Sequence, residues 1–199
     1  MKYTTIEQSL IKSGDIVLFH NGSFSIFSSA IRLLTHSYWN HCGMIVEENG
    51  EFFVIEALGK VEKTSLSKYI NNKNIDIKII RLKEEAFKDK KEYDAGIHIA
   101  IERIKKSIGA KYDVFAIVYL GMVYGLQIIG RIIPKSWNPF EQRSKFFCSE
   151  LLCVICYNIS SKNPYLFQGK TKQKCGTTTP RDIAKSVNTG YVTGNKDKL

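Results

Sequence analysis

A cysteine at the start of an apolar segment is the first candidate for chemistry. Cys148 follows two aromatic residues and precedes Ser149 and Glu150, and the segment 151–157 carries apolar residues on nearly every side. Such a segment predicts a buried helix that begins near Cys148. The positive end of a helix lowers the pKa of a thiol, and a thiolate is a nucleophile. A free cysteine is also a common buried apolar residue, so this segment alone leaves both interpretations open.

A second candidate pair, His41 and Glu56, is brought together by a predicted hairpin. Asn49-Gly50 lies between two apolar runs and favours a two-residue type I′ turn. With that turn Gly43 lies opposite Glu56, and His41 is a diagonal neighbour of Glu56 on the same face. A carboxylate beside an imidazole is the arrangement that orients a general base. Taken singly, the two residues are more typical of a surface histidine and a solvated carboxylate.

The strands are predicted from apolar runs and alternation. The other face of the hairpin is apolar and should pack into the core; it is formed by Cys42, Met44, Val46, Phe53, Ile55 and Ala57. A buried strand is predicted at 16–19 and a half-buried, alternating strand at 75–82. The polar segment 158–178 is expected to be a long loop, and the tail from Val187 is expected to be poorly ordered.

The helices are predicted from the helical period of apolar residues. This period occurs at 24–34 and 97–108, and Thr179-Pro180 predicts the start of a short helix. The segment 114–129 is a run of sixteen residues without a charge. It is short for a bilayer span, so a buried helix packed through its glycines is favoured, with a membrane-dipping segment as the alternative.

The composition indicates one globular domain with a basic surface. The chain has 199 residues, 44% hydrophobic and 24% charged, and a formal net charge of +10. This charge favours anionic partners such as phosphates or lipid headgroups, although a solvated basic face is the simpler interpretation. The first residues contain no apolar signal core, so a cytoplasmic protein is expected, with peripheral membrane association as a further possibility.

The cysteine pattern does not indicate a disulfide framework. Three of the five cysteines, Cys148, Cys153 and Cys156, fall within nine residues of one predicted helix. We therefore expect a reducing compartment, or a fold that does not depend on disulfides. The spacing of these three, with Cys175 later, matches a plant-type iron–sulfur loop, but the intervening residues are apolar and the helix points the thiols in different directions.

No cofactor or metal is expected. A zinc site formed by His41, Cys42 and Cys148 is disfavoured because His41 and Cys42 should face opposite sides of one strand. The sequence contains neither a Gly-rich phosphate loop nor an aromatic RNA-binding pattern. Specific nucleic-acid binding is therefore not expected.

Three segments occur in an order that resembles a known family. Gly14-Asp15 precedes the strand at 16–19, His41 opens the next strand, and Cys148-Ser149-Glu150-Leu151 follows late in the chain. This order resembles the circularly permuted branch of the NlpC-type, papain-like cysteine hydrolases, and two further segments fit it: Lys111-Tyr112-Asp113 and Thr179-Pro180-Arg181-Asp182. The resemblance implies one α+β domain over 1–199, with its core at about 13–186 and a small, mostly antiparallel sheet or half-barrel packed against helices on one side.

The resemblance also implies a catalytic triad. In it Cys148 is the nucleophile, His41 the base and Glu56 the residue that orients the base. The hairpin register reaches the His41–Glu56 pair independently, whereas a contact between His41 and Cys148 rests on the resemblance. Two features depart from the family pattern, namely Cys42 directly after the histidine and the cysteine-rich helix, and neither is expected to touch the triad.

The implied activity is hydrolysis of an amide bond in a peptide or lipid-linked substrate. One alternative is a thiol-dependent acyltransferase or lipid deacylase similar to lecithin:retinol acyltransferase, for which 114–129 and the basic surface would suit a lipid and an anionic membrane surface. The other is a basic binding module without turnover, which would leave Cys148 unreactive. The sequence does not predict the substrate or the oligomeric state.

Overall fold

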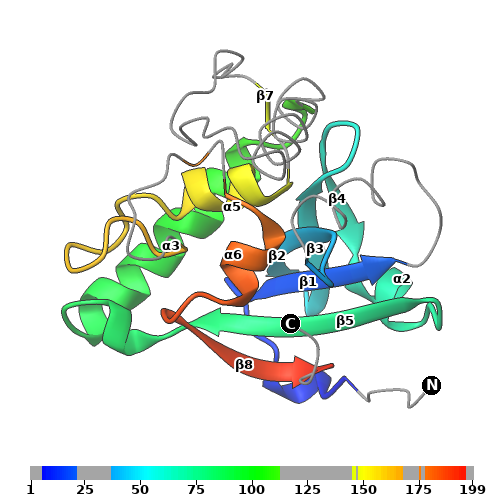
Figure 1. Cartoon of the computed structure of the whole chain (residues 1–199), viewed down its shortest axis with the longest axis horizontal. Helices are drawn as coiled ribbons and strands as arrows, with labels where there is room; N and C mark the ends of the chain where they lie inside the picture. The colour runs from blue at the N-terminus through cyan, green and yellow to red at the C-terminus, as the bar shows by residue number, and fades with distance from the viewer. Residues whose placement is uncertain are drawn as a thin grey trace, which may run out of the picture.

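The computed structural model describes residues 6–21, 37–112, 145–146, 148–167, 175 and 178–195. The helices predicted at 24–34 and 114–129 lie outside the described residues. The described part forms a six-stranded antiparallel sheet with helices on both faces (Figure 1).

The sheet has the strand order β4-β3-β2-β1-β5-β8. Its strands are β1 (Ile16–Asn21), β2 (His41–Glu48), β3 (Glu51–Ala57), β4 (Val61–Ser65), β5 (Ile75–Leu82) and β8 (Thr189–Gly194). Two short strands pair in parallel beside it, β6 (Lys111–Tyr112) and β7 (Lys145–Phe146). The helices are η1 (Gln8–Leu10), α2 (Leu66–Ile70), η2 (Glu84–Ala86), α3 (Lys90–Lys106), α5 (Cys148–Ile155) and α6 (Pro180–Ala184).

The predicted hairpin is confirmed with its register. In the β2–β3 ladder Gly43 pairs with Glu56, and Glu48 pairs with Glu51. Asn49 and Gly50 both have positive φ, 54° and 79°, as a type I′ turn requires. The predicted apolar face of the hairpin also lies in the core, where it contacts residues of α3 and α5.

The second face of the sheet is also covered, which corrects the expectation of helices on one side and of a half-buried strand at 75–82. Val17 and Phe19 of β1 lie in a second apolar cluster with Leu66 of α2, and Tyr69 packs against it. The short helix α2 follows β4 directly and places its apolar residues on this face. As a result Glu56 is 0% exposed, so the interpretation of Glu56 as a solvated carboxylate is wrong.

Most of the described residues after Val187 lie in a strand, which corrects the expectation of a poorly ordered tail from Val187. Thr189–Gly194 forms β8 and pairs with β5, so it completes one edge of the sheet. The predicted short helix before it is confirmed, with Pro180 in its first turn and a capping box between Thr179 and Asp182.

A buried ion pair fixes the start of β1. Asp15 is 0% exposed, and its carboxylate accepts hydrogen bonds from Arg81 at 2.6 and 2.9 Å and from the Lys12 N–H at 2.9 Å. Gly14 has φ +92°, and a Cβ there would lie 2.5 Å from Ile97 of α3. The Gly-Asp pair before the strand therefore has a structural role, because it joins β1 to β5 and lets α3 approach closely.

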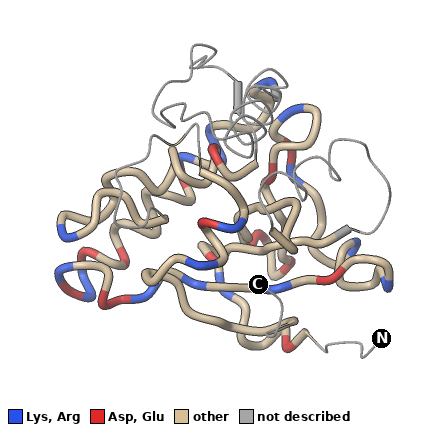
Figure 2. Tube along the Cα trace, in the orientation of Figure 1, with Lys and Arg blue, Asp and Glu red and all other residues tan. Residues whose placement is uncertain are grey.

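The charged residues do not form a single cluster in the trace. Figure 2 shows lysines and arginines interspersed with acidic residues along the described elements. None of the described helices is long and apolar enough to cross a bilayer.

Candidate active site

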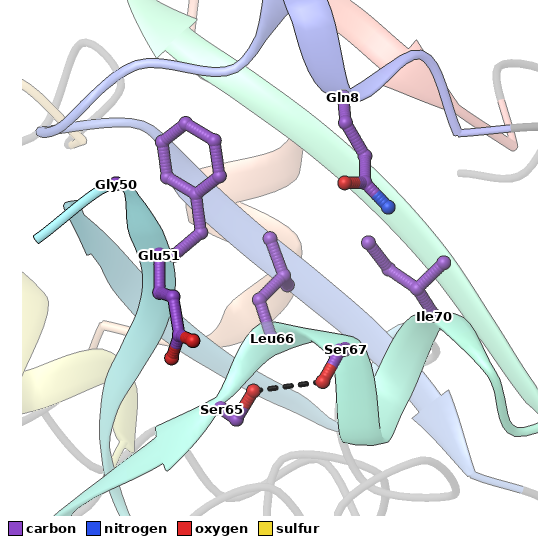
Figure 3. Close-up of a pocket in the computed structure, with 8 residues that line it drawn as sticks. Gln8, Gly50, Glu51, Ser65, Leu66, Ser67 and Ile70 are labelled. Atoms are coloured by element: carbon purple, nitrogen blue, oxygen red, sulfur yellow. Dashed lines mark hydrogen bonds between the residues drawn. The ribbon is translucent and has the colours of Figure 1, made fainter. Parts of the chain in front are cut away.

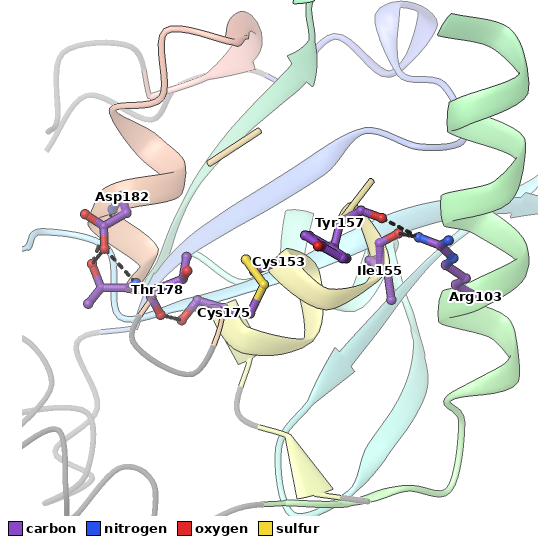
Figure 4. Close-up of a disulfide and its surroundings, with 9 residues drawn as sticks. Arg103, Cys153, Ile155, Tyr157, Cys175, Thr178 and Asp182 are labelled. Atoms are coloured by element: carbon purple, nitrogen blue, oxygen red, sulfur yellow. Dashed lines mark hydrogen bonds between the residues drawn. A yellow bond between two sulfur atoms is a disulfide. The ribbon is translucent and has the colours of Figure 1, made fainter. Parts of the chain in front are cut away.

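Cys148 is the first residue of α5 and is buried at 3% exposure. The helix packs on β2 and β3, and its apolar residues, among them Leu151 and Leu152, belong to the main core. Its first turn is fixed by Ser149, whose hydroxyl donates to the Thr178 carbonyl at 2.7 Å. Its last turn is fixed by Arg103 of α3, which donates to the carbonyls of two residues, Ile155 at 3.1 Å and Tyr157 at 2.7 Å (Figure 4).

His41, the first residue of β2, faces Glu56 as the hairpin register predicts. The distance from His41 Nε2 to Glu56 Oε2 is 2.6 Å, and the histidine side chain is 16% exposed. The Phe19 ring stacks on the imidazole with 5.7 Å between ring centroids. The imidazole is therefore held by a carboxylate at one nitrogen and by an aromatic ring on one face.

Cys148 contacts this histidine, so the structure brings together the three residues singled out in the sequence. Burial lowers the pKa of His41, but the charge of Cys148 and hydrogen bonds with Cys148 and Glu56 outweigh burial and raise that pKa from 6.5 to about 10. Because Nε2 is directed at Glu56, Nδ1 is left for the sulfur. A charged imidazole beside a thiol favours the thiolate.

Cys42 also contacts Cys148, which corrects the expectation that it would not touch the triad. A hydrogen bond from the Cys42 thiol lowers the pKa of Cys148, and the charge of His41 lowers it further. Burial raises that pKa but is outweighed, so the pKa of Cys148 lies well below its ordinary value of 9.0. Burial and the neighbouring Cys148 raise the pKa of Cys42 well above that value, so Cys42 keeps its proton and can donate.

His41 and Cys42 lie on opposite faces of β2, as predicted, yet both contact Cys148. Their side chains leave β2 on opposite faces, but Cys148 begins a helix that abuts the first residues of β2 and reaches both. Within the described ranges, no group of three or more His, Cys, Asp or Glu side chains is arranged to bind a metal ion.

Two further residues contact the site that were not predicted from the sequence. The Tyr69 hydroxyl, on α2, donates to Glu56 Oε1, and Thr64 of β4 also forms a side-chain hydrogen bond with Glu56. Burial raises the pKa of Glu56, but hydrogen bonds from His41, Tyr69 and Thr64 outweigh burial and hold that pKa below its usual value. Thr64 pairs with Val54 in the β3–β4 ladder, so it shares a face with Glu56, which an alternation argument could have found once β4 was recognised.

A disulfide joins α5 to the segment before α6, whereas the cysteine pattern did not indicate a disulfide framework. Cys153 of α5 is bonded to Cys175 (Figure 4). Among the described cysteines, Cys42, Cys148 and Cys156 are free. The partner of Cys153 lies 22 residues away in sequence, so the clustering of cysteines on one helix gave no signal for this bond.

A pocket lies beside α2, away from the thiol. It has a volume of about 300 Å³ and is lined by Leu66, Ser67 and Ile70 of α2, with Gln8 and Phe52 (Figure 3). None of the three predicted triad residues lines it.

The fold and the site define the class of protein. A helix that begins with a buried cysteine, packed on an antiparallel sheet whose strand carries the facing histidine, is the arrangement of papain-like cysteine hydrolases. The chain belongs to the family of permuted papain-like amidases of the YaeF/YiiX type, the C92 family, whose model matches residues 10–116. The matched range contains His41 and Glu56, and Cys148 follows it.

Among solved structures the chain is similar to the metalloprotein YiiX from Escherichia coli O157:H7. The TM-score is 0.57 at 20% sequence identity, and the similarity covers 92% of this chain and 97% of that chain. This likeness shows the fold. No curated protein matches the chain. The predicted resemblance, the α+β papain-like fold and the assignment to cysteine hydrolases are confirmed.

Proposed function

We propose that Cys148, His41 and Glu56 form the catalytic triad of this amidase. The observation that supports the proposal best is the continuous, largely buried contact from the Cys148 thiol through the imidazole to the Glu56 carboxylate, with 2.6 Å at its second step. In this proposal the resting enzyme holds a thiolate and an imidazolium, and Glu56 balances the imidazolium charge.

In the acylation step, the Cys148 thiolate attacks the carbonyl carbon of the amide, and the electron pair of the carbonyl moves to its oxygen. The backbone N–H of Cys148 supports the oxyanion because it lies at the start of α5, where N–H groups have no partner within the helix. His41 gives its proton to the leaving nitrogen, the C–N bond breaks, and an amine leaves a thioester on Cys148.

In the deacylation step, water replaces the amine. Neutral His41 takes a proton from the water as the water oxygen attacks the thioester carbon. The C–S bond breaks, the carboxylic acid is released, and the thiolate–imidazolium pair is restored. Glu56 holds the imidazole orientation through both steps.

The substrate that we propose is an amide bond in a peptide or a lipid-linked molecule. Hydrolysis is proposed in preference to acyl transfer because the matching family is one of amidases; the apolar run 114–129, which would suit a lipid substrate of an acyltransferase, lies outside the described residues. The net charge of +10 supports transient contact with an anionic membrane surface. Co-sedimentation with anionic and neutral liposomes tests that contact; binding that is equal on both would contradict it.

The test of the triad is the rate at which iodoacetamide alkylates Cys148 as a function of pH, followed by mass spectrometry. We expect rapid labelling below pH 7 in the wild type and its loss in His41→Ala. Cys156 is an internal control because burial raises its pKa to about 12. Labelling of Cys148 that is as slow as that of Cys156, or that is unchanged in His41→Ala, would contradict the proposal.

A further inference from the structure

We infer that Tyr69 is a positioning residue of the active site, whose hydroxyl fixes the Glu56 carboxylate in the orientation that holds His41 toward Cys148. This inference rests on the proposed triad and extends it by one residue. It follows from how the two oxygens of Glu56 are occupied, from what holds the Tyr69 ring, and from the element that carries the tyrosine.

The Glu56 carboxylate divides its two oxygens between two donors. Oε2 lies 2.6 Å from His41 Nε2, and Oε1 accepts from the Tyr69 hydroxyl. The residue is 0% exposed, and buried carboxylates require hydrogen-bond donors because water cannot replace them. Without Tyr69 the carboxylate would lose the donor on Oε1 and would be held by His41 and Thr64 alone, so the oxygen that faces His41 would be less firmly fixed.

The Tyr69 ring packs on Phe19, the same aromatic residue that stacks on His41. The centroid of Tyr69 lies 4.5 Å from that of Phe19, and Phe19 in turn stacks on His41 at 5.7 Å. Phe19 is 2% exposed. Tyr69 therefore acts on the His41–Glu56 pair in two ways, by a hydrogen bond from its hydroxyl to Glu56 and by packing on Phe19. Removal of the hydroxyl would abolish the hydrogen bond and leave the ring packing.

Strand β4 places two polar residues beside this contact. The Thr64 hydroxyl of β4 lies within hydrogen-bond reach of both Tyr69 and Glu56, and Glu62 of the same strand lies opposite Glu56 and adds negative charge near the phenol. Burial and the Glu56 carboxylate raise the pKa of Tyr69, so the phenol remains a donor over the working pH range. The hydroxyl thus stays protonated and donates to Glu56, which stabilises the ionised form of the carboxylate.

The test compares Tyr69→Phe, Glu56→Gln and the double variant by the pH dependence of Cys148 alkylation. We expect Tyr69→Phe to move the acid limb of the profile to higher pH by less than the roughly one unit that corresponds to losing a hydrogen bond to the thiolate itself, because Tyr69 acts on Cys148 only through Glu56 and His41. In the Glu56→Gln background the same change should have no further effect, because the group through which Tyr69 acts is already altered.

Two more variants serve as controls. Tyr93→Phe removes a hydroxyl from a half-buried ring that packs on Phe87, and it should leave the profile unchanged. Thr64→Val removes another hydrogen-bonding group from the carboxylate and should move the limb in the same direction as Tyr69→Phe. Thermal unfolding of each variant separates these effects from a loss of fold, and Thr64→Val keeps the test possible if Tyr69→Phe does not fold.

The outcomes separate this inference from the triad. If wild-type Cys148 is not labelled rapidly, or if His41→Ala labels like the wild type, the triad itself fails. If those two behave as proposed but Tyr69→Phe has the wild-type profile, the role of Tyr69 is wrong and the triad stands. An equal shift from Tyr69→Phe in the wild-type and Glu56→Gln backgrounds would also overturn the inference, because Tyr69 would then act independently of Glu56.

Discussion

Gly43 lies directly across the β2–β3 ladder from Glu56, and the structure leaves no space for a side chain between them. A Cβ on Gly43 would lie 2.5 Å from Val54 Cγ1 and 3.1 Å from Glu56 Cβ. The glycine therefore leaves the diagonal between His41 and Glu56 open. The hydrogen bond between His41 and Glu56 therefore depends on the lack of a side chain at Gly43 as well as on the two side chains that form it.

Gly43→Ala is expected to disturb the site and the sheet together. The added methyl group must displace Val54 or Glu56, so we expect a loss of about 1–3 kcal/mol in the free energy of unfolding, typical of overpacking, and slower alkylation of Cys148. Gly59→Ala is the matched control, because nothing lies within 4 Å of a Cβ there. Urea unfolding and iodoacetamide labelling of both variants measure the difference; equal behaviour would contradict the packing argument.

Cys42→Ala is expected to raise the pKa of Cys148. The thiolate loses a hydrogen-bond donor, so the acid limb of the labelling profile should move to higher pH by roughly one unit. Cys42→Ser retains a donor and should move the limb less. Cys156→Ala, which removes another buried free thiol, should not move it. A limb that stays in place in Cys42→Ala would mean that the Cys42 thiol serves only as core packing.

The thiolate–imidazolium pair should make the free energy of unfolding independent of pH over a middle range of pH. The pKa of His41 is raised from 6.5 to about 10. The contribution of His41 to the free energy of unfolding is therefore complete below pH 6.5 and is lost as pH rises toward 10. The pKa of Cys148 is lowered from 9.0, so its contribution is complete above pH 9 and is lost as pH falls through the lowered value.

Together these two contributions should make the stability rise up to about pH 6.5, stay level to about pH 9 and fall above it. The measurement is the difference in the free energy of unfolding between wild type and Cys148→Ala, determined by urea at a series of pH values. A difference that is the same at pH 5, 7.5 and 10 would show that the pair is uncharged.

Reduction of the Cys153–Cys175 bond is expected to destabilise the fold. The bond spans 22 residues, and the chain-entropy estimate for such a loop is about 3 kcal/mol. Dithiothreitol should lower the free energy of unfolding of the wild type by this amount. It should have no effect on a Cys153→Ala, Cys175→Ala double variant, which already lacks the bond. A wild type that is insensitive to dithiothreitol would contradict the prediction.

The parts of the site that the sequence predicts are those governed by local rules. The Asn49-Gly50 turn fixes the register of two adjacent strands, and from this the pairing of His41 with Glu56 follows without knowledge of the rest of the fold. The position of Cys148 at a helix start follows from the apolar run after it. The contact between Cys148 and His41 joins distant parts of the chain, and it was predicted only through the family resemblance.

The parts that the sequence did not predict depend on packing between distant segments. Tyr69 lies on a five-residue helix, too short to give a helical period, and its role appears only once α2 covers the second face of the sheet. Strand β8 contains two glycines and little apolar periodicity, and its pairing with β5 supplies the order that its own sequence lacks. The partner of Cys153 is likewise set by tertiary structure.

The order of elements along the chain has a consequence for synthesis on the ribosome. Strands β1 to β5 and α2, which carry the base, its carboxylate and Tyr69, all precede α5. An emerging chain can therefore assemble the hydrogen-bonded half of the site before the nucleophile has been translated, since folding proceeds from the N-terminal side during synthesis. In the proposed triad Cys148 is therefore the last of the three residues to be translated, and we expect incomplete chains that end before α5 to lack hydrolytic activity.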